Sequence, residues 1–150
     1  MSSGTDQRRE DTQVIPEQTL TRVHFVCIGN TCRSPMAAAL ANRYGDDVLI
    51  ATSSGLSPVP VIVPETIAIM EEINIDVSGH VPSWYQPLAA SDYDVVVNIS
   101  GLRLPGEPPK QLLEWKVEDP YRRPREVYVR VRGQLEQLVM QLILRLRKRQ

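Results

Sequence analysis

The chain has 150 residues, of which 42% are hydrophobic, and its 17 basic and 18 acidic side chains give a formal net charge of −1. This composition is enough for one domain with a buried core, and the balanced charge excludes the strongly basic signature of a nucleic-acid-binding protein. No apolar run approaches the ~18 residues that would predict a membrane span, and the two cysteines do not make a secreted disulfide framework but favour a reducing, cytoplasmic location.

Residues 1–21 are polar and lack the apolar stretch of a signal peptide. They predict a flexible N-terminal tail, and residues 22–150 then form a single domain. Within that domain, hydrophobic periodicity and turn residues predict strands that alternate with helices. The predicted strands lie at 23–28, 48–52, 94–99 and 112–116, and the predicted helices lie at 35–44, 64–73 and 125–148.

Two of these segments carry the clearest patterns. The helix at 125–148 has apolar side chains at three- and four-residue spacing on one face. The strand at 94–99 is a β-branched run, which is typical of a strand buried on both faces. We therefore predict an α/β fold, a three-layer α/β/α arrangement around a four-stranded parallel sheet. Ligands in such folds bind beyond the carboxyl ends of the strands.

The segment from Cys27 to Pro35 joins the first predicted strand to the first predicted helix and carries the strongest chemical signal. It places the Cys27 thiol and the Arg33 guanidinium at the two ends of a short loop. Inward-facing loop amides, the positive end of the helix dipole and the Arg33 charge all favour the thiolate, which is the nucleophilic form of cysteine. The same donors would bind the oxygens of a tetrahedral oxyanion, with Arg33 making a two-pronged contact.

Local signals inside this loop support the same interpretation. Gly29 permits close backbone approach, and Asn30 tolerates a left-handed conformation. Ser34 and Pro35 are a favoured N-cap and first residue of a helix, and we expect the Ser34 hydroxyl to hydrogen-bond the Cys27 sulfur. The alternative is a structural cysteine followed by a surface helix. The predicted oxyanion-binding residues of the loop are Ile28, Gly29, Asn30, Thr31, Cys32 and Ser34.

Attack by a thiolate on a phosphate ester also needs a proton donor for the leaving oxygen, and Asp119 is the best candidate. It follows the fourth predicted strand, so it should lie over the same sheet edge, and Pro120 restricts it to extended conformations. Beside a thiolate and a bound phosphate, a neutral carboxylic acid is favoured over a second anion. Tyr121 would flank the pocket and stack on an aryl ester. An ordinary Asp-Pro turn is the alternative.

The loop from Cys27 to Pro35, together with Asp119-Pro120-Tyr121, resembles the low-molecular-weight protein tyrosine phosphatase superfamily over about residues 22–146. The resemblance implies a four-stranded parallel sheet and hydrolysis through a cysteinyl-phosphate, without a metal or other cofactor. It implies that Cys27 is the nucleophile, Arg33 the phosphate clamp, and Asp119 the general acid and then the base. It also implies a polar network that holds the loop, made by Asn30, Ser34, Ser54 and His80.

The same superfamily includes arsenate reductases, and the stretch from Pro64 to Asp76 is similar to that branch, as is Glu114-Trp115 before the acid. Thioredoxin-coupled reductases carry two further cysteines after the third strand. This sequence has Ser100-Gly101-Leu102-Arg103 there and no cysteine beyond Cys32. Counting thiols therefore excludes a relay of three thiols within this sequence and leaves open a reductase that uses a small external thiol.

Three functions follow as hypotheses. The first is a cysteine-dependent phosphatase acting on phosphotyrosine protein or another aryl phosphate. The alternative is an arsenate reductase that uses a small external thiol, and the third is a non-catalytic module that binds phosphate or another oxyanion. Phosphate or arsenate is the expected ligand. We expect no nucleic-acid or membrane partner, no metal, and a monomer or weak dimer.

Three other features of the sequence stand apart from this motif. His24 lies in a strand pattern and receives no function. Cys32 is either a packing residue or the partner of Cys27 in a reversible disulfide that protects the nucleophile. The basic residues from Arg145 to Arg149 complement the negative end of the last helix.

Overall fold

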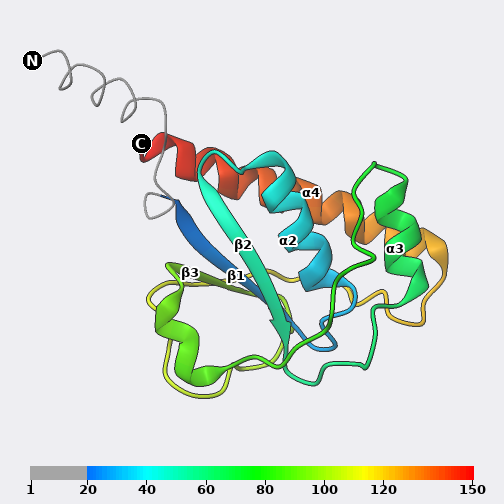
Figure 1. The fold of residues 1–150 in the computed structure, drawn as a ribbon, viewed down its shortest axis with the longest axis horizontal. Helices are drawn as coiled ribbons and strands as arrows, with labels where there is room; N and C mark the ends of the chain where they lie inside the picture. The colour runs from blue at the N-terminus through cyan, green and yellow to red at the C-terminus, as the bar shows by residue number, and fades with distance from the viewer. Residues whose placement is uncertain (1–19) are drawn as a thin grey trace, which may run out of the picture.

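Four parallel strands form the centre of the fold, in the order β2-β1-β3-β4. The computed structural model describes residues 20–150, so the predicted tail lies almost entirely outside the described residues. Figure 1 shows the chain order of the elements. They are β1 (Thr21–Cys27), α2 (Arg33–Tyr44), β2 (Leu49–Gly55), α3 (Pro64–Glu71), the 3-10 helix η2 (Pro87–Asp92), β3 (Val95–Asn98), β4 (Leu112–Glu114) and α4 (Arg125–Lys148).

The register of the sheet brings the ends of its strands together. Cys27, the last residue of β1, lies opposite Gly55 at the end of β2, and Val26 lies opposite Asn98 at the end of β3. Because all the strands are parallel, the segments that follow them leave from the same edge of the sheet. That edge is where a ligand site is expected in this architecture.

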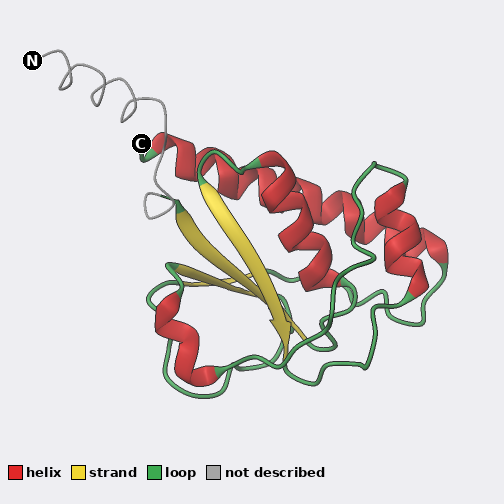
Figure 2. Cartoon of the chain, in the orientation of Figure 1, coloured by secondary structure: helices red, strands yellow, loops and turns green. Residues whose placement is uncertain are grey.

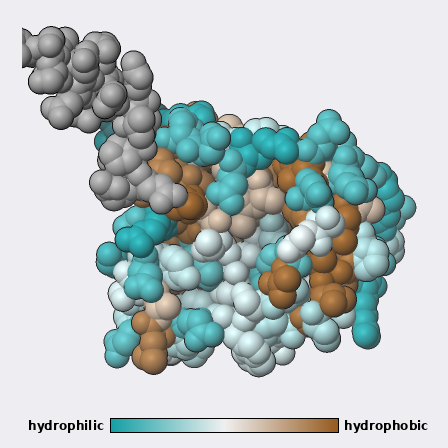
Figure 3. All heavy atoms as spheres, in the orientation of Figure 1, coloured by the Kyte–Doolittle hydropathy of each residue, from teal (hydrophilic) through white to brown (hydrophobic). Residues whose placement is uncertain are grey.

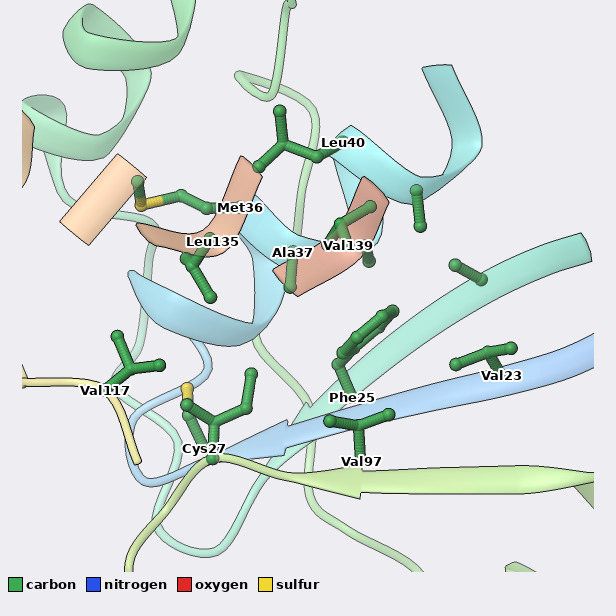
Figure 4. Close-up of a cluster of buried hydrophobic side chains, with 14 of the residues drawn as sticks. Val23, Phe25, Cys27, Met36, Ala37, Leu40, Val97, Val117, Leu135 and Val139 are labelled. Carbon is green, nitrogen blue, oxygen red and sulfur yellow. The ribbon is translucent and has the colours of Figure 1, made fainter. Parts of the chain in front are cut away.

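The helices α2, α3 and α4 cover one face of the sheet (Figure 2). Side chains alternate across a strand, so Val23, Phe25 and Cys27 project from β1 toward α2 and α4, as Figure 4 shows. Leu40 of α2 and Leu135 of α4 are fully buried in the same cluster. The prediction from hydrophobic periodicity is confirmed for this face, and α4 has the predicted bounds.

The opposite face is covered by η2 and the extended segment around it (Figure 2). Its buried hydrophobic cluster is small and consists of Val26, Tyr85, Ala90 and Val96. The predicted α/β fold with its four-stranded parallel sheet is confirmed. Its third layer is a 3-10 helix with loops; Pro87 begins that helix, and Pro82 lies in the extended segment before it.

The surface drawn in Figure 3 is mixed, with hydrophobic side chains in separate patches. None of the helices in residues 20–150 is long and apolar enough to cross a membrane. The exposed large hydrophobic side chains are spread over several elements, including Val61, Val81, Trp84, Leu88, Leu102 and Leu144.

Candidate active site

Cys27 ends β1 and is only 2% exposed. Its sulfur lies 2.9 Å from the Ser34 hydroxyl and accepts a hydrogen bond from the Ser34 amide at 3.4 Å. The predicted contact between Ser34 and the Cys27 sulfur is therefore present. Two donors from the first turn of α2 face the thiol, and both stabilise the thiolate.

In the Cys27 loop (residues 27–33), the six backbone carbonyls of residues 27–32 accept hydrogen bonds from donors outside the loop, and so they point away from its centre. Three of these donors are amides after β2, one is a histidine ring, one is a threonine hydroxyl and one is an amide of α2. The pairs are Cys27 with Leu56 N (3.1 Å), Ile28 with Ser57 N (2.8 Å), Gly29 with Val59 N (3.1 Å), Asn30 with His80 Nε2 (2.9 Å), Thr31 with Thr66 Oγ1 (2.7 Å) and Cys32 with Met36 N (3.1 Å).

This arrangement determines where the loop amides point. In a planar trans peptide, a carbonyl and the next N–H point in opposite directions, so the amides that follow the engaged carbonyls turn toward the centre of the loop. They form a concave nest of partial positive charge, at the N-terminal end of α2. The nest is suited to the oxygens of a tetrahedral oxyanion held above the Cys27 sulfur.

Asn30 is the residue around which the loop turns. Its φ of 53° lies in the left-handed region, which asparagine tolerates better than most residues. Its buried side chain donates to the hydroxyls of Ser34 at 2.8 Å and Ser53 at 3.0 Å, and its Oδ1 accepts from the Ser83 amide at 2.9 Å. Asn30 therefore ties the loop to β2 and to the segment that leads to η2.

Gly55 lets β2 approach the loop closely. A Cβ at this position would lie 2.6 Å from the Ile28 carbonyl oxygen and 2.9 Å from the Asn30 nitrogen. Both contacts are too short for a real side chain, and both are to backbone, which cannot rotate away. A glycine is therefore required at this junction.

Arg33 is held by carbonyls at the ends of two neighbouring strands. Its Nη1 donates to the Ile99 oxygen at 2.8 Å and to the Val117 oxygen at 3.0 Å, and the side chain is 5% exposed. Its buried Nε finds no acceptor among the described residues. Arg33 is thus a fixed guanidinium with a donor left for a ligand oxygen.

Asp119 lies on the other side of Arg33. Its Oδ2 is 3.4 Å from Arg33 Nη2, and its side chain is 43% exposed. Its Oδ1 accepts from the Tyr121 amide at 3.1 Å, which fixes the carboxylate in a tight turn. The Arg122 guanidinium lies 5.4 Å from the centroid of the Tyr121 ring. A bound oxyanion would compete with Asp119 for the Arg33 donors.

The three predicted catalytic residues meet around one small cavity of about 90 Å³. Of the predicted binding residues, Asn30 and Ser34 are buried and lie outside its lining, where they support the loop. Ser57 and Val59, which follow β2, complete the wall and were not among the predicted site residues. The residues that line the cavity are Cys27, Ile28, Gly29, Thr31, Cys32, Arg33, Ser57, Val59, Asp119 and Tyr121.

The structure corrects one detail of the predicted helix start. We expected Ser34 as N-cap and Pro35 as first residue, but α2 begins at Arg33 with Cys32 as N-cap, and no side chain caps it. The reason is that the Ser34 hydroxyl is engaged by Cys27 and Asn30. The orphan amides at this helix end point instead toward the sulfur and the cavity.

His80 and Ser54 both touch the loop network, in different ways. His80 Nε2 donates to the Asn30 carbonyl at 2.9 Å. Ser54 accepts from the Ser34 hydroxyl with its backbone carbonyl at 3.4 Å, while its own hydroxyl pairs with His24. The β2 hydroxyl that Asn30 contacts belongs to Ser53. Ser53 was missed because two adjacent serines cannot be told apart without the register of β2.

Cys32 also lines the cavity, but its surroundings differ from those of Cys27. Its Sγ lies 3.7 Å from the Tyr128 hydroxyl in the core, and burial raises the pKa of the Cys32 thiol to about 11. Cys32 is therefore a neutral thiol at physiological pH. Within residues 20–150, no three or more His, Cys, Asp and Glu side chains are grouped as metal ligands would be.

Comparison with known proteins gives one family. Residues 22–104 match the model of the low molecular weight phosphotyrosine protein phosphatases. The glutaredoxin arsenate reductase of Synechocystis sp. is 39% identical over 131 residues, which cover 85% of this chain and 99% of that protein. Arsenate reductase 2 of Staphylococcus haemolyticus is 30% identical over 118 residues, which cover 76% of this chain and 89% of that protein.

Solved structures agree with this comparison. An arsenate reductase in its phosphate-binding state has a TM-score of 0.77 and 36% sequence identity, covering 85% of this chain and 99% of that one. An arginine phosphatase from Geobacillus stearothermophilus has a TM-score of 0.74 at 24% identity, covering 87% of this chain and 95% of that one, and it supports the fold alone.

Proposed function

Because this chain belongs to the low molecular weight phosphotyrosine protein phosphatase family, we propose that it is an arsenate reductase. In this proposal, Cys27 forms a covalent adduct with arsenate, and a thiol outside the chain supplies the two electrons. The first hypothesis from the sequence, an aryl phosphatase, becomes the second candidate. The change rests on the relatives, which are arsenate reductases, and on the size of the cavity.

The cavity is the observation that carries the proposal. Its volume of about 90 Å³ is well below the roughly 300–1,000 Å³ of sites for drug-sized ligands. Val59 lines it beside Gly29, whose carbonyl accepts a hydrogen bond from the Val59 amide at 3.1 Å. A bare tetrahedral oxyanion suits such a space better than an oxyanion joined to an aromatic ring.

The first step is attack of the Cys27 thiolate on the arsenic of arsenate. A sulfur–arsenic bond forms, and the bond from arsenic to a hydroxyl oxygen of protonated arsenate breaks; the leaving hydroxyl takes a proton from Asp119 and departs as water. The loop amides and Arg33 hold the remaining oxygens and stabilise the charge that develops on them.

The second step transfers the electrons. An external thiolate attacks the Cys27 sulfur, so that a disulfide bond forms and the sulfur–arsenic pair stays on arsenic, which leaves as arsenite. A second external thiol attacks the mixed disulfide and releases the Cys27 thiolate. Overall, arsenate and two thiols give arsenite, one disulfide and water.

An external thiol is required because the sequence contains only two cysteines. Cys32 is poorly suited to the role, because burial keeps its pKa near 11 and attack requires the thiolate. The name of the Synechocystis relative supports glutaredoxin as one source of reducing equivalents. A small thiol is the other.

Hydrolysis of a phosphomonoester is the second candidate, and the position of Asp119 favours it. A carboxyl group 3.4 Å from Arg33 Nη2 can protonate a leaving alkoxide and then activate water toward the cysteinyl-phosphate. That cycle needs no second thiol. Tyr121 at the wall of the cavity would contact an aryl group that projects from it.

One pair of assays separates these functions. The purified protein is given arsenate with a small thiol, or with a glutaredoxin and its reducing system, and arsenite is measured. In parallel, it is given an aryl phosphate under reducing conditions with a chelator. We expect arsenite formation in the first assay, and aryl phosphate turnover alone would favour the phosphatase. Inactivity in both assays, with phosphate still bound, would favour the oxyanion-binding module.

Two variants test the assigned roles in the active assay. Cys27→Ser should abolish turnover, and Asp119→Ala should lower it about 10²–10⁴-fold, the usual contribution of general acid catalysis. Glu107→Ala is the matched control, because Glu107 is an exposed carboxylate away from the cavity. Full activity of Cys27→Ser would overturn the mechanism.

A further inference from the structure

His24 is a buried, ionisable side chain that the proposed mechanism leaves unused. It lies on β1 near Cys27, projects from the opposite face of the sheet, and is 4% exposed. Its Nδ1 lies 2.6 Å from Thr52 Oγ1, and its Nε2 lies 2.6 Å from Ser54 Oγ. The ring stacks on Tyr93 with centroids 4.2 Å apart. The imidazole therefore clamps two alternate residues of β2 at the end that meets the Cys27 loop.

His24 acts as a neutral group at physiological pH. Burial lowers the pKa of its imidazole from 6.5 to about 4, and its aromatic neighbours, Tyr85 and Tyr93, come from the segment around η2. A neutral imidazole has one donor and one acceptor, and the two hydroxyls of β2 can satisfy both. Its influence on the site is therefore geometric.

The contact between His24 and Ser54 is connected to Cys27 through the Ser34 hydroxyl. This hydroxyl has a single proton and two acceptors, the Cys27 sulfur at 2.9 Å and the Ser54 carbonyl at 3.4 Å. Its own oxygen already accepts from Asn30. The position of the Ser54 carbonyl therefore decides how strongly it competes with the sulfur for the proton.

We propose that His24 is a positioning residue of the Cys27 site, which holds the Ser54 carbonyl back so that the Ser34 hydroxyl donates to the thiolate. An O–H···O bond is most favourable near ~2.7–2.8 Å. A carbonyl released from the clamp would relax toward the hydroxyl and draw the proton from the sulfur. The inference rests on Cys27 being the reactive thiolate of the proposed function.

The other ionisable groups at the site do not depend on His24. Arg33, Asp119 and Cys32 line the cavity with Cys27, and His80 contacts the loop from outside through the Asn30 carbonyl. None of the contacts recorded for them within residues 20–150 includes His24 or the Ser54 hydroxyl. A change at His24 therefore leaves these charges in place, and it acts on the end of β2 and on the Tyr93 ring that stacks on the imidazole.

The test measures the reactivity of Cys27 as a function of pH. The full-length protein is treated with iodoacetamide from pH 4.5 to 9, and mass spectrometry follows modification of Cys27. For His24→Leu and Ser54→Ala, we expect the midpoint of the profile to rise by about 0.5–1 pH unit, so that alkylation below the midpoint slows about three- to tenfold. His24→Gln keeps an amide toward Ser54 and should restore most of the wild-type profile.

Tyr85→Phe is the matched control. It changes one oxygen on the same face of the sheet, and its ring lies 6.2 Å from that of His24, so its profile should match the wild type. Ser54→Ala keeps the test meaningful if His24→Leu fails to fold, because it removes only the hydroxyl. A midpoint that stays constant or falls in folded Ser54→Ala overturns the proposal. Alkylation needs no arsenate, so the result is independent of the substrate assay.

Discussion

The two faces of the sheet are built from different chemistry. The face toward α2 and α4 buries an apolar cluster that includes Phe25, Met36, Leu40 and Leu135. The face toward η2 buries four hydrophobic residues beside the imidazole of His24 and its two hydroxyl partners. We infer that the helical face supplies most of the stability and that the η2 face fixes the position of β2 beside the Cys27 loop.

The largest expected difference in stability is between substitutions of two neighbouring residues on β1 that point to opposite faces of the sheet. Phe25 is fully buried and its ring lies 5.6 Å from that of Trp115. We expect Phe25→Ala to lower the free energy of unfolding by about 3–5 kcal/mol, and Val26→Ala, on the η2 face, to lower it by about 2 kcal/mol. Urea unfolding at pH 7 measures both, and an equal or larger loss for Val26→Ala would contradict the comparison.

Acid should destabilise the η2 face through His24. The folded-state pKa of about 4 lies below the unfolded value of 6.5, so the unfolded chain binds the proton more readily. The stability contributed by neutral His24 is present above pH 6.5 and is lost as the pH falls toward 4. The full loss is about 3 kcal/mol.

Urea unfolding at pH 7, 5.5 and 4 tests this prediction, with His24→Gln as the control. Exposed carboxylates such as Glu72 and Glu118 have pKa values lowered by neighbouring arginines and also lose stabilising interactions in acid. They are the same in both proteins, so the difference between the two curves isolates His24. Parallel curves would show that His24 does not titrate in this range.

Gly55 tests the junction between β2 and the Cys27 loop. We expect Gly55→Ala to cost about 1–3 kcal/mol, because the new methyl group would meet the Ile28 oxygen at 2.6 Å. It should also reduce catalytic activity by displacing loop carbonyls and amides. Gly79→Ala is the control, since nothing lies within 4 Å of a Cβ there. Thermal unfolding and the arsenite assay measure both effects. Wild-type stability and wild-type activity of Gly55→Ala would contradict this prediction.

The smallest predicted change in stability comes from removing a tyrosine hydroxyl on either face of the sheet. The buried Tyr85 hydroxyl has no hydrogen-bond partner among the described residues, so Tyr85→Phe should leave stability unchanged or raise it by up to about 1 kcal/mol. Tyr128→Phe, on the helical face, loses the contact with Cys32 and should lower stability by up to about 1 kcal/mol. Thermal unfolding measures both, and a clear loss for Tyr85→Phe would reveal a partner for its hydroxyl.

The parts of the fold that were predictable follow from short-range patterns. The apolar spacing of α4 and the preceding Pro124 determine its bounds, and parallel strands bring Cys27 and Asp119 to one edge of the sheet. The motif around Cys27 is local in the sequence, so its residues could be assigned without the structure. Cys32 packs in the main hydrophobic cluster, and its alternative role as the disulfide partner of Cys27 remains a prediction.

The supporting residues outside the motif and its resemblance could not be predicted, because they act through the backbone and across long separations. Ser57, Val59 and Thr66 are ordinary loop and helix residues, and their role depends on which loop carbonyl each one reaches. His24 looked like any strand residue because its hydroxyl partners come from β2. Choosing between Ser53 and Ser54 requires the exact orientation of each β2 residue, which hydrophobic periodicity does not resolve.

The outward carbonyls of the Cys27 loop have a consequence for protein engineering. Apart from an amide of α2, their partners come from the segment after β2, from α3 and from His80, so the shape of the loop depends on distant parts of the chain. Grafting residues 27–35 onto another strand–helix junction would transfer the thiol and the guanidinium without the scaffold that orients the amides. A useful transplant would have to carry the sheet edge together with the motif.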